Sequence, residues 1–146
     1  GWELFNGKGQ CAQCHPGKIQ GAEPGPLFTD FVYYNIGVPK NFDNPYLYSP
    51  PRMNPEGVDF IDHGLANIVV RFSASSTERL LQTLKDIVHF HNTRDGPEAG
   101  WPPPEIPANM TSDGVGHLGL TDAEEDALVA FLKTLTDGHR PQPARP

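Results

Sequence analysis

The stretch Cys11-Ala12-Gln13-Cys14-His15 decides how the rest of the chain must fold. Two cysteines separated by two residues and followed directly by a histidine form the attachment signature of c-type haem. Each thiol adds to a vinyl group of the porphyrin, and the histidine is then held under the iron as its proximal ligand. Because the chain has a single copy of the motif, we expect one haem c bound covalently through Cys11 and Cys14, with His15 on the iron.

Two other uses of a Cys-x-x-Cys pair agree less well with the sequence. A thioredoxin-like redox pair needs a helix N-terminus inside a βαβ pattern, and the Gly/Pro-rich surroundings of Cys11 show no such alternation. A structural zinc site needs two further ligands at a second paired spacing, and the chain has only 2 cysteines. The haem uses both cysteines, so no disulfide is expected.

Length and composition predict a small helical protein. The 146 residues suffice for one domain, which we place at residues 1–138, with a disordered tail at 139–146. The 15 glycines and 16 prolines predict long irregular connections between few helices. Together with the haem c signature at Cys11–His15, this makes the expected fold class all-α, a cytochrome c-like helical haem domain with long Gly/Pro-rich loops.

The charge of the chain restricts its partners. Lys+Arg number 11 against 18 Asp+Glu, for a formal net charge of -7. This makes nucleic acid and anionic membranes poor partners, and favours redox partner proteins with a basic docking face.

No signal peptide and no apolar run of membrane-spanning length is visible. Covalent haem attachment belongs to the periplasm or an equivalent compartment, so we expect an exported protein, processed before Gly1 or cut from a longer chain.

Two of the three predicted helices lie at the ends of the chain. Residues 2–8 read as a short helix whose Trp2 and Phe5 share one side, packed against the haem edge or a later helix. Near the C-terminus, Thr121 and Glu124 form a capping box. The expected buried face of that last helix, which Gly138 would end, consists of Leu128, Phe131, Leu132 and Leu135.

The middle helix supplies the candidate for the second axial ligand of the iron. Ser75 and Glu78 form a capping box that predicts its start, and its apolar stripe at helical spacing consists of Leu80, Leu81, Leu84, Ile87, Val88 and His91. His91 therefore faces inward, and we expect it to bind the iron. His89 instead follows Lys85 by four residues and shares the polar side, and the helix ends at residues 92–96.

The remaining segments are expected to be loops around the haem. The aromatic stretch 28–39 is expected to lie over the haem as an extended loop or short strand. Residues 16–26 and 40–57 are further loops, and the stiff connection 96–119 is expected to wrap the pocket. The expected pocket residues are Phe28, Phe31, Tyr34, Leu84 and Val88.

Five stretches of the chain match one known family of haem proteins. They are Leu4-Phe5 ahead of Cys11 to His15, Phe28-Thr29-Asp30-Phe31 through Asn35-Ile36-Gly37-Val38-Pro39, Asn54-Pro55-Glu56-Gly57, Thr83-Leu84 to Asn92-Thr93-Arg94-Asp95, and Leu118 to Asp126 through Phe131 to Leu135. Through these stretches, which cover most of the chain and of which the last two are the most specific, the chain resembles the C-terminal haem domain of the bacterial di-haem cytochrome c peroxidase/MauG family.

The resemblance implies roles for particular residues. It makes Cys11 and Cys14 the thioether residues and His15 the proximal ligand. The family's distal ligand, methionine in peroxidases and tyrosine in MauG, sits seven residues after the leucine that matches Leu84, and His91 occupies that position here. The resemblance and the helix periodicity thus select the same residue.

The sequence departs from the family in two ways. The 146 residues contain no counterpart of the family's N-terminal haem domain, where the family's peroxide chemistry takes place. Between Gly64-Leu65 and Ser75 the chain lacks the family's proline-leucine-arginine-asparagine and aromatic-histidine-glycine motifs, so residues 66–82 must cover the haem differently. This difference keeps Met53 and Met110 as alternative ligands.

Three functions follow from these observations. With histidine on both sides of the iron, the protein would be an electron carrier rather than a catalyst, with a lower potential than its methionine-ligated relatives. A peroxidase or gas-binding protein would need a displaceable sixth ligand and a distal base, for which His63, His89 and His117, each more simply a surface or loop histidine, are the candidates. The third alternative is a haem subunit of a larger multi-haem assembly.

Overall fold

The fold consists of a few short helices joined by long loops. We describe residues 1–17, 27–63 and 81–135 of a computed structural model. Within these ranges the α-helices are α1 (Trp2–Asn6), α2 (Leu84–Thr93) and α3 (Asp122–Thr134), and the 3-10 turns are η1 (Cys11–Gln13), η2 (Pro45–Tyr48), η3 (Gly57–Asp59) and η5 (Pro97–Ala99). The described ranges contain no strand beyond one isolated bridge between Pro39 and Pro104. The predicted all-α class is confirmed.

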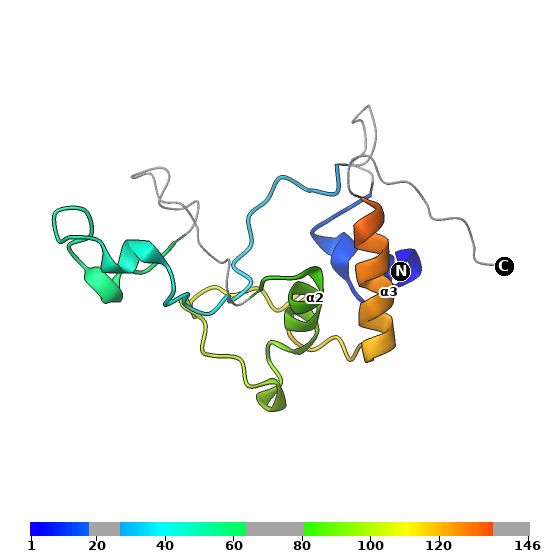
Figure 1. The fold of residues 1–146 in the computed structure, drawn as a ribbon. Helices are drawn as coiled ribbons and strands as arrows, with labels where there is room; N and C mark the ends of the chain where they lie inside the picture. The colour runs from blue at the N-terminus through cyan, green and yellow to red at the C-terminus, as the bar shows by residue number, and fades with distance from the viewer. Residues whose placement is uncertain (18–26, 64–80, 136–146) are drawn as a thin grey trace.

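The core lies where α1 and α2 pack on α3 (Figure 1). Its buried apolar residues are Phe5, Val88, Leu120 and Leu128. The predicted Trp2/Phe5 side of α1 packs against α3, since the Phe131 ring centroid lies 5.2 Å from Phe5 and 5.5 Å from Trp2. None of the helices in the described ranges is long and apolar enough to span a bilayer.

Helix α3 begins as predicted but ends earlier. The Thr121 side chain accepts a hydrogen bond from the Glu124 amide, and the Glu124 carboxylate accepts one from the Thr121 amide. The helix ends at Thr134, because the Leu135 amide bonds to the Leu132 carbonyl and so tightens the last turn. Gly138 therefore does not end it, and Leu135 is 41% exposed rather than buried. Gly138 and the predicted tail 139–146 lie outside the described residues.

Helix α2 begins later than the sequence predicts. Thr83 is its N-cap, with extended backbone (φ -123, ψ 159), and forms a capping box with Asp86. The apolar stripe therefore starts at Leu84, and Leu81 precedes the helix, so the prediction of a continuous helix from Ser75 is wrong. The predicted capping box of Ser75 and Glu78, like the loop 18–26, lies outside the described residues.

A buried carboxylate joins α2 to α3. Glu125 is 1% exposed. Its Oε1 accepts a hydrogen bond from Asn92 at 2.7 Å and lies 2.9 Å from His89 Nδ1, while its Oε2 lies 2.9 Å from Lys85 Nζ. Burial alone would raise the pKa of Glu125, but the hydrogen bonds from Asn92, His89 and Lys85 outweigh it and lower the pKa. The polar side of α2 therefore packs on α3, and His89, whose side chain is 44% exposed, contacts Glu125 from the surface of the molecule.

The C-terminal end of α2 holds the surrounding loops. The Asn92 side chain donates to the Leu120 carbonyl (2.9 Å) and accepts from the Leu120 amide (2.8 Å). The guanidinium of Arg94 donates to the carbonyls of Ile36 (3.0 Å) and Thr111 (2.9 Å). Segments far apart in the sequence therefore meet at residues 92–94.

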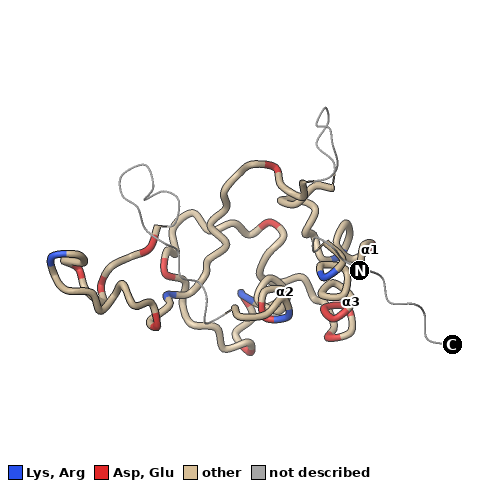
Figure 2. The backbone as a smooth tube through the Cα atoms, turned by 45° about the horizontal axis from the view of Figure 1, so that its top comes forward, with Lys and Arg blue, Asp and Glu red and all other residues tan. Residues whose placement is uncertain are grey.

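Residues 41–61, which we call the outer lobe, lie at the opposite end of the molecule from α1 and α3 (Figures 1 and 2). Buried Leu47 and the T-shaped contact of Tyr46 with Phe60, whose centroids are 4.9 Å apart, fill its small core. The buried Asn54 side chain donates to the carbonyls of Tyr46 (3.0 Å) and Gly57 (2.8 Å). The predicted loop 40–57 thus contains the 3-10 turn η2, and η3 begins at its last residue.

We expect Asn92→Ala to lower the free energy of unfolding by about 3 kcal/mol, because buried groups of Leu120 and Glu125 lose their hydrogen-bond partner. Urea unfolding measures the change. Asn6→Ala is the matched control, since the exposed Asn6 side chain makes one bond, to the Trp2 carbonyl at 2.9 Å. Equal losses in the two variants would contradict the role given to Asn92.

We expect Glu125→Gln to destabilise the protein by about 2 kcal/mol at pH 7, because hydrogen bonds to a charged group are lost. The folded-state pKa is lowered, so the carboxylate stabilises the fold above the ordinary pKa and this contribution disappears as the pH falls through the folded value. Urea unfolding at pH 7 and at stepwise lower pH should therefore show the difference between the two proteins shrinking as the pH falls through the folded-state pKa of Glu125. A pH-independent difference would contradict this account, and the exposed variant Glu98→Gln is the control.

Candidate haem site

The turn after α1 carries both cysteines. The Gly9 amide bonds to the Leu4 carbonyl at 2.8 Å, and Gln10 takes left-handed backbone (φ 53), so the chain reverses directly before η1. The His15 amide then bonds to the Cys11 carbonyl at 2.9 Å, which closes the motif into a compact turn. Both cysteines are free and partly buried, and burial is the main cause that raises the pKa of each. Protonated thiols do not fit the reactive thiolate of a redox pair.

The backbone orients the imidazole of His15. Its Nδ1 lies 2.8 Å from the Phe28 carbonyl oxygen. A carbonyl only accepts hydrogen bonds, so Nδ1 carries the proton and Nε2 presents its lone pair. This is the second-shell arrangement found at histidines that bind a metal. Nε2 of His15 is therefore the nitrogen available to an iron.

His91 has the same arrangement on α2. Its Nδ1 lies 2.8 Å from the carbonyl oxygen of Ile87, one turn earlier in the helix. Burial, with smaller contributions from the charges of His15 and Arg94, lowers the pKa of His91. The ring is therefore neutral at neutral pH, with its lone pair on Nε2.

Large apolar side chains near these histidines are exposed. On α2, Leu84 and Ile87 share the face of His91 and are each 37% exposed. In the segment 27–38, which runs from the α1/α3 end of the molecule toward the outer lobe (Figure 1), the exposed ones are Leu27, Phe31, Val32, Tyr33 and Tyr34. Exposed apolar surface of this kind marks a binding site. The two thiols, the two Nε2 atoms and this surface together fit a haem c.

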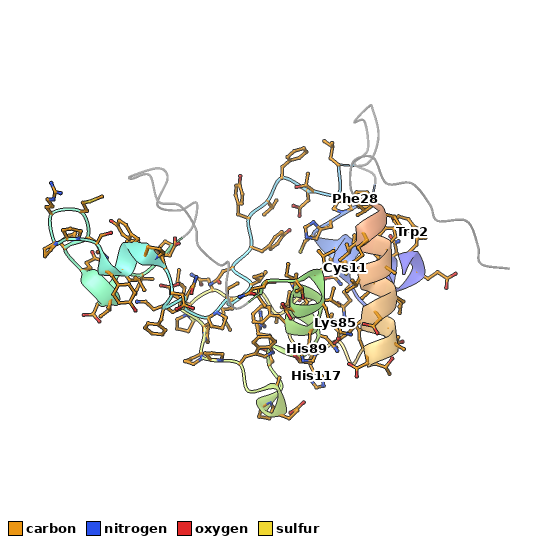
Figure 3. The ribbon with its side chains drawn as sticks, viewed as in Figure 1. Trp2, Cys11, Phe28, Lys85, His89 and His117 are labelled. Atoms are coloured by element: carbon orange, nitrogen blue, oxygen red, sulfur yellow. The ribbon has the colours of Figure 1, made fainter. Side chains whose placement is uncertain are left out.

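The predicted pocket residues separate into two groups. Phe31, Tyr34 and Leu84 belong to the exposed apolar surface. Phe28 instead packs against Phe5, with centroids 5.7 Å apart, and Figure 3 shows it near Trp2 at the α1/α3 end, with Cys11 beside it. Val88 is buried in the core. Phe28 thus contributes to the site through its carbonyl oxygen, which binds His15, and not through its ring.

The methionines and the other candidate histidines lie in different surroundings. Met53 is 58% exposed on the outer lobe, at the other end of the molecule from Cys11 (Figures 1 and 3). The Met110 sulfur packs over Gly37, where a Cβ atom would lie 2.5 Å from it. His63 and His117 are exposed.

Sequence reasoning missed Asp30 and Tyr34 as a pair. The Tyr34 hydroxyl donates to Asp30 Oδ2 at 2.5 Å, and Asp30 Oδ1 accepts from the Val32 amide at 2.9 Å. The hydrogen bond to Asp30 is the main cause that raises the pKa of Tyr34 to about 12. The signal available in the sequence was a carboxylate inside the densest aromatic stretch.

Comparisons with known proteins identify the family of the chain and several relatives. The family model for cytochrome c matches residues 1–136. The methylamine utilization protein MauG of Paracoccus denitrificans (strain Pd 1222) is 30% identical over 157 residues, covering 87% of this chain and 39% of the relative. The cytochrome-c peroxidases IdrP2 and IdrP1 of Denitromonas iodatirespirans are 27% and 26% identical, over 93% of this chain. The resemblance seen in the sequence is confirmed, and the chain spans about two fifths of the length of these relatives.

Proposed function

The chain belongs to the cytochrome c family, and we propose that it carries single electrons through one haem c held between His15 and His91. Membership of this family implies covalently bound haem c. The single Cys-x-x-Cys-His motif supports one haem, bound through Cys11 and Cys14. When bound, the group supplies a one-electron ferric/ferrous couple.

The matched hydrogen bonds of the two histidines carry this proposal. Nδ1 of His15 and Nδ1 of His91 each lie 2.8 Å from a backbone carbonyl oxygen, so each ring is oriented and presents Nε2. His15 and His91 would then occupy both axial positions and leave no open position for peroxide or dioxygen. Leu84 and Ile87 would cover the macrocycle and exclude water from its distal side.

A peroxidase-like protein is the second candidate, and two relatives favour it, since they are cytochrome-c peroxidases. Such a reaction would need His91 to leave the iron and another group to act as the distal base. His89 is held by Glu125 at 2.9 Å and packs on Trp101 with centroids 6.1 Å apart, on the polar side of α2. The surroundings of His89 therefore favour a structural role.

The proposal includes a compartment and a partner. Thioether attachment of haem supports an exported protein, in the periplasm or an equivalent compartment. The formal charge of -7 supports a redox partner with a basic docking face, and Figure 2 shows the acidic positions spread along most of the molecule. A place in a larger multi-haem assembly is the alternative to a free carrier.

We expect His91→Ala to retain covalent haem but to open one axial position. The ferric absorption spectrum should change from low-spin to high-spin, and added imidazole should restore the low-spin form. An unchanged spectrum would show that another residue holds the distal position. His117→Ala, a change at an exposed histidine, is the control and should keep the wild-type spectrum.

We expect Met53→Leu and Met110→Leu to leave the ferric spectrum and the reduction potential unchanged, because neither sulfur is proposed as a ligand. His91→Met should raise the reduction potential, within the ≈ 0.8 V range that axial ligands span. A spectroelectrochemical titration measures both. A lower potential in His91→Met, or the loss of a sulfur-to-iron band in either leucine variant, would exclude the bis-histidine assignment.

A further inference from the structure

A carboxylate is fixed next to the proposed proximal ligand. Asp30 stands two residues after Phe28, whose carbonyl oxygen lies 2.8 Å from His15 Nδ1. Both oxygens of the Asp30 carboxylate are used, one by the Val32 amide at 2.9 Å and the other by the Tyr34 hydroxyl at 2.5 Å. The side chain is therefore held in place although it lies at the surface.

The charge of Asp30 acts on the residues of the haem motif. The Tyr34 hydrogen bond, followed by that of the Val32 amide, lowers the pKa of Asp30, and the nearby His15 contributes in the same direction. After burial, the charge of Asp30 is the next largest cause of the raised pKa of Cys14, whose thiol also interacts with the Tyr34 hydroxyl. Asp30 is thus ionised at neutral pH, and it belongs to the same short segment as the Phe28 carbonyl that holds His15.

We propose that the Asp30 carboxylate, held by Tyr34, is a fixed negative charge on the proximal side that lowers the reduction potential of the haem. This inference rests on the proposed haem site. Oxidation adds one positive charge at the metal, and a nearby negative charge stabilises the more positive state. Second-shell groups and net charge are known means of setting such potentials. Asp30 contributes through its charge and binds no iron.

Spectroelectrochemical titration of the haem-loaded chain tests the proposal. In Asp30→Asn, at a fixed ambient potential, the ratio of ferric to ferrous protein should fall about tenfold, a rise of ~59 mV for a one-electron couple. Asp30→Glu keeps the charge and should restore the wild-type potential. Asp59→Asn, which removes the same charge from the outer lobe, should change the ratio by less than about twofold because solvent screens distant charges.

Tyr34→Phe separates a charge effect from loosening of the segment. Removing the hydroxyl leaves the carboxylate less neutralised, so the potential should fall, opposite to Asp30→Asn. Because Tyr34→Phe keeps the carboxylate, it tests whether the charge of Asp30 lowers the reduction potential even if the Asp30→Asn protein retains no haem. An unchanged potential in Asp30→Asn, or a rise in Tyr34→Phe, would overturn the proposal. The wild-type spectrum tests the two-histidine site separately, so failure of one is distinguishable from failure of the other.

Discussion

The hydrogen bonds at the C-terminal end of α2 are the constraint on which the rest of the structure depends. The Asn92 side chain donates to the Leu120 carbonyl and accepts from the Leu120 amide, and it also donates to the buried carboxylate of Glu125. Arg94 binds the carbonyls of Ile36 and Thr111. These bonds fix α2 on α3 and bring the aromatic segment alongside, so the face of α2 that carries His91 is left for a ligand.

The sequence predicts local features well and long-range ones poorly. The Cys11–His15 motif and the Thr121 capping box were found because each is encoded within five residues. The start of α2 was misplaced because Thr83 and Asp86 form a second capping box inside the apolar run that follows Ser75. Two such signals eight residues apart cannot be ranked from local sequence, since contacts with the rest of the chain decide between them.

The packing of α2 shows why its faces were only partly predictable. A helix with one apolar and one polar side is expected to bury the apolar side. Here the side of Lys85 and His89 packs on α3 because Glu125 supplies a buried negative charge, while Leu84 and Ile87 stay partly exposed. The proposed haem would cover the apolar face, but it is not part of the sequence. The periodicity of the residues therefore cannot show that this face packs on a ligand instead of on the protein core. The same reasoning explains why the core of the chain is small and its aromatic segment exposed.

Iron X-ray absorption of the oxidised, haem-loaded protein tests the central claim most directly, because it reports which atoms surround the metal. With His15 and His91 as axial ligands, the first shell must contain six nitrogen atoms, four from the porphyrin and two from imidazoles. A sulfur atom in that shell, an oxygen from solvent, or only five ligands would contradict the two-histidine site and with it the account of a closed electron carrier.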